Sequence, residues 1–145
     1  MTPEFKTYMQ QVVKNAQAMA GALQQKGWRI VSGGTDNHLM LVDLAIKNLT
    51  GKDASAALDK ARITVNKNAI PFDPTSPMVS GGIRIGTPAV TTRGMKEGQM
   101  QQIAGFIDKV MNAMTDEGVA GQVARDVEHL TNKFPLYPEL LKAIA

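Results

Sequence analysis

Residues 79–88, VSGGIRIGTP, set a short strand between two sharp changes of chain direction. Two glycines precede Ile83, Arg84 and Ile85, and a glycine and a Thr-Pro pair follow them, which is typical of a strand with defined ends. Ile83 and Ile85 share one face of such a strand, and the charge of Arg84 lies on the other. Two alternatives follow for Arg84. It lies on the solvent-exposed face of an edge strand, or it is buried and its planar guanidinium binds a carboxylate or phosphate through two hydrogen bonds.

The sequence before this strand predicts a helix, a hairpin and a second helix. Apolar residues recur at helical spacing over residues 3–26, with Thr2 as a cap and Gly27 as the end. Residues 66–77 contain three prolines and should form a long irregular loop of the kind that often carries function. The other predicted elements are strands over 28–31, 38–44 and 63–66, a helix over 53–62, and helices over 96–114 and 117–133 after the 83–85 strand.

This order predicts an α+β fold, in which helices cover a small, mainly antiparallel sheet. The run 39–42 is apolar in succession and predicts a central strand covered on both faces. A helix of about 24 residues is about 36 Å long, more than one small sheet needs, so part of it should project. We therefore expect a connecting helix over 1–27 and a compact domain over 28–145.

Composition excludes several classes of protein. The chain has 145 residues, 43% of them hydrophobic and 20% charged, which suits one globular core. It has no cysteine, so thiolate metal sites and cysteine nucleophiles are excluded. The net charge of +3 is scattered and argues against nucleic acid. No apolar run reaches membrane-helix length and the first residues lack a signal-peptide layout, so we expect a cytoplasmic protein without membrane contact.

Few side chains suggest chemistry of their own. His38 and His129 have no partners at metal-ligand spacing, so structural or solvent-exposed roles are favoured and no metal site is predicted. The sequence contains the residue types of a catalytic triad in Ser32, Asp36 and His38, but the G-x-S-x-G motif of a nucleophile elbow is absent from it. The glycines around 81–86 do not form a phosphate loop, because the strand lies inside the cluster instead of before it.

Three stretches together resemble one family. They are VSGGTDNHL at 31–39, ITVNKN at 63–68 followed by Ile70-Pro71, and GIRIGTPAVTTRG at 82–94. In this order they resemble the C-terminal part of serine hydroxymethyltransferase, over nearly the whole chain. The resemblance implies the small C-terminal domain of a fold-type I, aspartate aminotransferase-like enzyme, cytoplasmic and assembled as a homodimer or homotetramer.

The resemblance also implies an activity and site residues. The family uses pyridoxal 5'-phosphate to interconvert serine plus tetrahydrofolate with glycine plus 5,10-methylenetetrahydrofolate. The position of Arg84 binds the amino-acid carboxylate in that family, Asn68 contacts the folate, and Ser76, Pro77 and Met78 border it.

The family's cofactor-binding lysine motif, of the type T-x-x-x-T-H-K-T, does not occur in this sequence. We therefore expect no catalytic residue here and no activity of the chain by itself. Two alternatives stay open. The chain is a self-standing α+β module that binds a small carboxylate through Arg84, or it is a structural domain that dimerises through its first helix.

Overall fold

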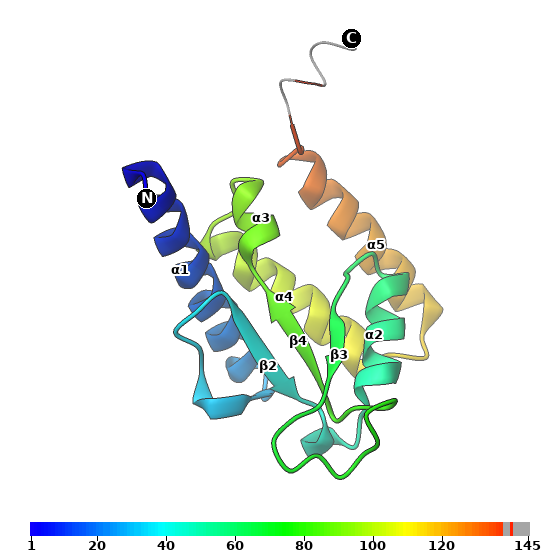
Figure 1. Cartoon of the computed structure of the whole chain (residues 1–145). Coiled ribbons are helices and arrows are strands. Elements are labelled where there is room, and N and C mark those ends of the chain that lie inside the picture. Colours follow the sequence, from blue (N-terminus) through cyan, green and yellow to red (C-terminus); the bar gives the residue numbers. More distant parts are fainter. Residues whose placement is uncertain (138–139, 141–145) are drawn as a thin grey trace.

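Four antiparallel strands form one sheet in the order β1-β2-β4-β3 in a computed structural model, which describes residues 1–137 and 140 (Figure 1). The predicted domain 28–145 extends through residues 138–139 and 141–145, which lie outside the described residues. The strands are β1 (Arg29–Ile30), β2 (Leu39–Asp43), β3 (Asn66–Asn68) and β4 (Gly82–Gly86). The helices are α1 (Pro3–Gln25), α2 (Gly51–Lys60), α3 (Pro88–Thr92), α4 (Glu97–Asn112) and α5 (Glu117–Asn132), with short 3-10 turns at Val31–Gly33 and Ala45–Lys47.

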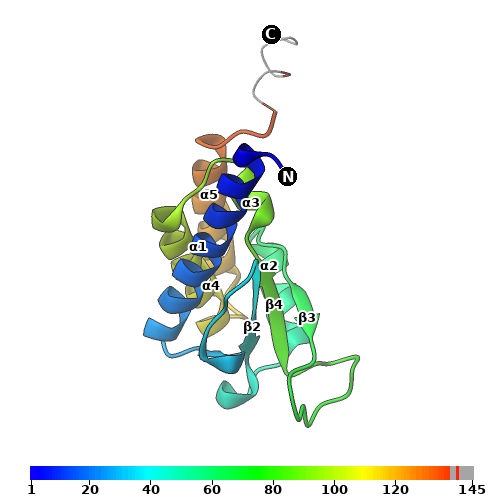
Figure 2. The ribbon, with the colours of Figure 1, turned by 60° about the vertical axis from the view of Figure 1, so that its left-hand side comes forward.

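The helices gather on one face of the sheet, and the other face of β2, β4 and β3 is left uncovered (Figure 2). Strand alternation explains the difference, because Met40 and Val42 of β2 and Ile83 and Ile85 of β4 point into the helical layer and are buried. The fold is thus α+β with a small antiparallel sheet and a helical layer, as predicted. Burial of the apolar faces of helices and sheet against each other is its main source of stability.

Helix α1 begins and ends where its sequence signals place it. The Thr2 hydroxyl accepts a hydrogen bond from the Phe5 amide at 3.3 Å. At the other end Gly27 has a φ of +82°, and the Trp28 amide donates to the Leu23 carbonyl at 3.1 Å. Together with the bond that the Gly27 amide donates to the Gln24 carbonyl at 2.9 Å, this bond forms a Schellman motif, which uses the left-handed freedom of glycine to stop the helix.

The second half of α1 is joined to the segment that follows β4. Asn15 is fully buried and donates to Thr91 Oγ1 at 2.8 Å and to the Met95 carbonyl at 2.9 Å. The Thr87 hydroxyl donates to the Val12 carbonyl at 2.9 Å. Because buried polar groups are costly unless paired, these bonds fix α1 against residues 87–95, directly after the strand that carries Arg84.

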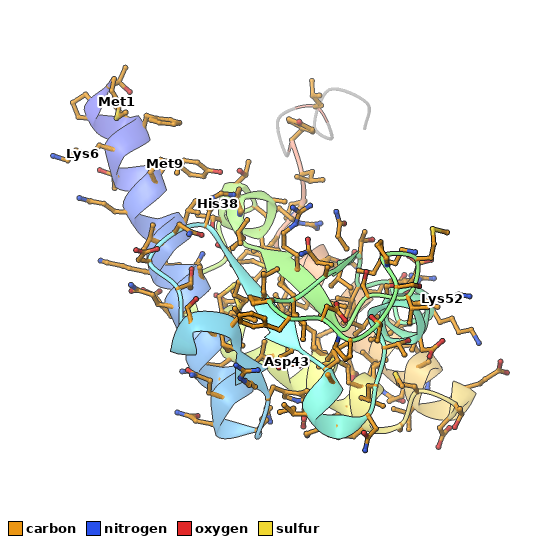
Figure 3. All side chains as sticks on the ribbon, turned by 60° about the horizontal axis from the view of Figure 1, so that its bottom comes forward. Met1, Lys6, Met9, His38, Asp43 and Lys52 are labelled. Atoms are coloured by element: carbon orange, nitrogen blue, oxygen red, sulfur yellow. The ribbon has the colours of Figure 1, made fainter. Side chains whose placement is uncertain are left out.

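The first half of α1 extends away from the sheet. Met1 and Phe5 are exposed, Met9 and Val13 are half-buried, and the four form an apolar groove along the helix. Figure 3 shows Met1, Lys6 and Met9 on this projecting end. The expected projection of the helix is therefore present.

Several boundaries differ from the predictions. The strand expected over 28–31 is limited to Arg29–Ile30, because the chain turns at Ser32 with a φ of +66°. The strand expected over 63–66 lies instead at Asn66–Asn68, since Arg62 has a φ of +62° and pairing with β4 starts only at Asn66. The short helix α3 was not predicted.

The prediction that residues 39–42 are covered on both faces is wrong for this chain. Met40 and Val42 are buried, whereas Leu39 and Leu41 are only half-buried on the uncovered face. A run of apolar residues cannot reveal which of its two faces has a neighbour in the same chain.

Candidate functional site

Arg84 lies at the middle of β4, on the uncovered face of the sheet. Its cross-strand partners are Leu41 on β2 and Asn66 on β3, so these three side chains share that face. Ile83 and Ile85 on either side are 0% and 6% exposed, whereas Arg84 is exposed. Neither alternative holds as stated for this chain, because β4 is an interior strand and not an edge strand, and Arg84 is exposed and not buried.

The arginines differ in how they are bonded. Arg29 pairs with Asp43 and Arg62 with Glu128, and Arg93 and Arg125 donate to carbonyl or amide oxygens. Arg84 makes no hydrogen bond or ion pair with any residue in the described part of the chain. A guanidinium presents five N–H donors in a rigid fork that matches a carboxylate. Its donors are therefore available for an external anion.

An open recess surrounds the Arg84 guanidinium. It is lined by His38, Leu39, Thr64, Val65, Asn66, Arg84 and Gly86. The lining residues besides Arg84 are apolar or polar, with no carboxylate among them. Sequence reasoning found Arg84 but missed Asn66 and Thr64, whose placement depends on strand register, and it assigned His38 a structural or solvent-exposed role.

The lining of this recess tests whether pyridoxal phosphate could be held here. That cofactor is bound through a lysine amine, and no lysine lines the recess. Lys67, on the neighbouring strand, donates to the Met78 carbonyl at 2.6 Å. The described residues at this recess therefore do not fit the cofactor by themselves, and no chemical step through it is derived for this chain.

Asn68 shares the uncovered face with Arg84, because it pairs with Gly82, two residues along β4. It is half-buried, and its side-chain amide donates to the Ala69 carbonyl at 2.7 Å. Ser76, Pro77 and Met78 are exposed on the loop beyond the ends of β3 and β4, and none of them lines the Arg84 recess. The sheet thus brings Asn68 and Arg84 onto one face and leaves the other three residues on a separate loop.

Asp73 organises that loop, and sequence reasoning did not single it out. Its Oδ1 accepts from the Thr75 hydroxyl at 2.7 Å and the Thr75 amide at 2.9 Å. Its Oδ2 accepts from the Gly81 amide at 2.7 Å and the Ile70 amide at 3.1 Å. The Thr75 hydroxyl, followed by the Gly81 and Thr75 amides, holds the pKa of this carboxyl well below its usual range. The signal in the sequence was Asp-Pro-Thr, since aspartate often bonds the backbone two residues on.

The glycines before Arg84 allow close approach of other parts of the chain. A Cβ on Gly82 would lie 2.6 Å from the Val42 carbonyl oxygen and 2.6 Å from Ile70 Cγ2. A Cβ on Gly81 would lie 2.9 Å from Asp73 Oδ1. Only residues without a side chain let the loop return this closely to the sheet, so the glycines support the geometry on which Arg84 depends.

None of the helices in the described residues is both long and apolar enough to cross a membrane. No group of three or more His, Asp or Glu side chains is arranged to hold a metal ion within residues 1–137 and 140. His129 is exposed on α5.

Comparisons with known proteins give one consistent result. Residues 1–107 match the family model described as serine hydroxymethyltransferase. The chain is 54% identical over 142 residues to a curated protein of Myxococcus xanthus named serine hydroxymethyltransferase. The match covers 98% of this chain but 34% of that relative, so the chain spans about a third of its length.

Proposed function

The chain belongs to the serine hydroxymethyltransferase family, and we propose that it forms the C-terminal part of an enzyme with that activity. The reaction interconverts serine plus tetrahydrofolate with glycine plus 5,10-methylenetetrahydrofolate. The partial coverage of the Myxococcus xanthus relative supports a role as one part of a longer protein. In that protein, the chain supplies the substrate-carboxylate group and part of the folate site.

One observation carries this proposal: Arg84 projects from an interior strand with its guanidinium unbonded to any described residue. In the complete enzyme the guanidinium binds the α-carboxylate of serine or glycine through two parallel hydrogen bonds. This contact fixes the amino acid relative to the reacting carbon without taking part in bond cleavage. The half-buried Leu39 and Leu41 beside it would be covered by another part of the enzyme, which lowers the local dielectric and strengthens the ion pair.

The folate contacts fall on the neighbouring region. Asn68 can present its amide to the pterin ring from the same face as Arg84, while Ser76, Pro77 and Met78 border the folate from the loop. Exposed Met78 and the loop backbone supply apolar and hydrogen-bonding contacts of the kind that a flat heterocycle needs.

Pyridoxal phosphate supplies the electron sink at the amino-acid α-carbon when it is bound in the complete enzyme. Its lysine lies outside this chain in our proposal, because no lysine lines the Arg84 recess. The chain by itself is therefore expected to be inactive. Purified chain mixed with pyridoxal phosphate should show neither the absorbance of a lysine-bound cofactor nor serine turnover; observation of both would contradict this expectation.

The overall architecture follows from the same proposal. The chain corresponds to the small C-terminal domain of a fold-type I enzyme, over 28–145, and residues 1–27 form the helix that connects it to the rest. The apolar groove of Met1, Phe5, Met9 and Val13 would then lie against that remainder. The complete enzyme is proposed to be a cytoplasmic homodimer or homotetramer, and the chain alone would pair with a second copy through the same groove.

The first test of the proposal is the reading frame of the gene upstream of Met1. An upstream reading frame that encodes the lysine motif supports the enzyme, and the purified product should then convert serine to glycine with dependence on tetrahydrofolate and pyridoxal phosphate. A natural start at Met1 with measurable carboxylate affinity would favour the self-standing module instead. A dimer without affinity for amino acids or folates in calorimetry would favour the structural domain.

A further inference from the structure

We propose that Asp73 is a positioning residue that fixes the loop over residues 70–81 and so determines folate affinity. The part concerning folate rests on the proposed function of Ser76, Pro77 and Met78. The part concerning the loop rests only on the geometry around the Asp73 carboxylate.

Asp73 joins three points that are distant along the loop. The amide of Ile70 lies near its beginning, Thr75 near its middle, and the amide of Gly81 at its end, where β4 starts one residue later. Both carboxylate oxygens are used, and each accepts two hydrogen bonds. One side chain therefore closes the loop onto the strand that carries Arg84.

Apolar burial does little to hold the middle of this loop, although Ile70 and Val79 near its ends are half-buried. Phe72 and Met78 are 102% and 73% exposed, and Pro74 and Pro77 are exposed as well. A loop with few buried apolar contacts opens easily unless something else restrains it. Hydrogen bonds are therefore the main restraint on this loop.

The remaining restraints act on one side of the loop. The Lys67 ammonium donates to the Met78 carbonyl at 2.6 Å, and the Lys52 amide donates to the Val79 carbonyl at 3.0 Å. Both bonds anchor the segment after Ser76, and the Ser76 carbonyl accepts from the Val79 and Ser80 amides at 2.9 Å each. In the described part of the chain, the segment from Ile70 to Thr75 is held mainly by Asp73, so the path of the loop from β3 to Ser76 depends on it.

Asparagine is the most informative replacement for Asp73, because it changes the hydrogen bonding of the side chain and not its size. It has nearly the same shape but one acceptor oxygen. In the place of Oδ2 its NH2 group would face the Ile70 and Gly81 amides, and in the place of Oδ1 it would face the Thr75 amide, while the Thr75 hydroxyl could turn to accept from it. Asp73→Asn should therefore break one or two of the four hydrogen bonds and replace the charge-assisted bonds that remain by weaker neutral ones. Asp59→Asn is the matched control, because it removes the same charge from an exposed position on α2.

The first measurement uses the chain itself and needs no ligand. Hydrogen exchange of the Ile70, Thr75 and Gly81 amides should become about ten-fold faster or more in Asp73→Asn, with helix amides unchanged. Asp59→Asn should leave all of these rates as they are. Unchanged exchange at the three loop amides in Asp73→Asn would overturn the proposal.

The second measurement uses the complete enzyme and separates the two substrates. Asp73→Asn should weaken tetrahydrofolate binding by about ten-fold or more while serine affinity changes less than about two-fold. Gly81→Ala provides an independent route, because its Cβ would lie 2.9 Å from Asp73 Oδ1 and displace the carboxylate. It should show the same selective loss.

Asn68→Ala separates failure of this proposal from failure of the proposed function. If Asn68→Ala weakens folate binding and Asp73→Asn does not, although its loop amides exchange faster, the positioning role is wrong and the folate site stands. If neither variant changes folate affinity, the folate assignment fails and the positioning role fails with it. Equal losses for serine and folate in Asp73→Asn would also contradict a selective role.

Discussion

Replacement of Asn15 by leucine should destabilise the chain by about 2–4 kcal/mol, because it removes a buried polar junction. Asn15 is 0% exposed, donates to Thr91 Oγ1 and the Met95 carbonyl, and accepts from Gln11 at 3.0 Å. Leucine leaves the buried Met95 carbonyl without this donor, which costs about 1–3 kcal/mol, and the lost bond to Thr91 adds about 1 kcal/mol. The Thr91 hydroxyl keeps its bond to the Thr87 carbonyl at 2.7 Å, which limits the damage.

Urea unfolding followed by fluorescence measures this change directly, because Trp28 is the one tryptophan of the chain and is 2% exposed. The midpoint should fall while the slope stays constant, and the melting temperature should drop by roughly 5–15 °C. Gln17→Leu on the exposed side of α1 is the control and should stay within about 0.5 kcal/mol of the original chain. If Asn15→Leu also stays within that range, the junction between α1 and residues 87–95 does not have the energetic role assigned to it.

Three further predictions concern the loop, the sheet and α2. Because the pKa of Asp73 is below its ordinary value, the charged carboxylate stabilises the loop fully above about pH 5, and this contribution is lost progressively as the pH falls further; the protection factor of the Gly81 amide, which corrects for the pH dependence of intrinsic exchange, should be the same at pH 5 and pH 7, and a lower protection factor at pH 5 would contradict this. Gly82→Ala should cost about 1–3 kcal/mol, since its Cβ would lie 2.6 Å from the Val42 carbonyl oxygen, and unchanged thermal stability would refute the close approach. Thr50→Ala should cost about 1 kcal/mol in urea unfolding by removing the hydroxyl that accepts from the Asp53 amide at 3.1 Å, whereas Thr50→Ser should retain most of that stability.

The sequence predicted the helices well because their signals are local. Thr2 and Gly27 each act within one turn of the helix that they start or end, and the structure places them in those roles. The strand around Arg84 was also predicted, since the glycines and the Thr-Pro pair define its ends within a few residues.

The predictions failed where the answer depends on distant partners. Whether β4 is an edge or an interior strand is decided by β2 and β3, and the strand 63–66 moved to Asn66–Asn68 because pairing with β4 determines where it begins. Leu41 is only half-buried because none of the described helices covers its face of the sheet, which the residues of the strand do not encode. Asp73 was missed because its role depends on Gly81, eight residues away, which returns to it only when the loop is closed.

The affinity of the complete enzyme for serine, measured with Arg84→Ala and Arg84→Lys, tests the central claim most directly. Loss of one partner of a desolvated charge pair costs about 2–5 kcal/mol, so Arg84→Ala should weaken serine binding by about 30-fold or more. Arg84→Lys should recover only part of this loss, because an ammonium cannot form the two parallel hydrogen bonds of a guanidinium. Thermal stability of the chain by itself should change little in either variant, since Arg84 is exposed and unbonded in the described part of the chain. Serine affinity equal to that of the original enzyme in Arg84→Ala would contradict the account.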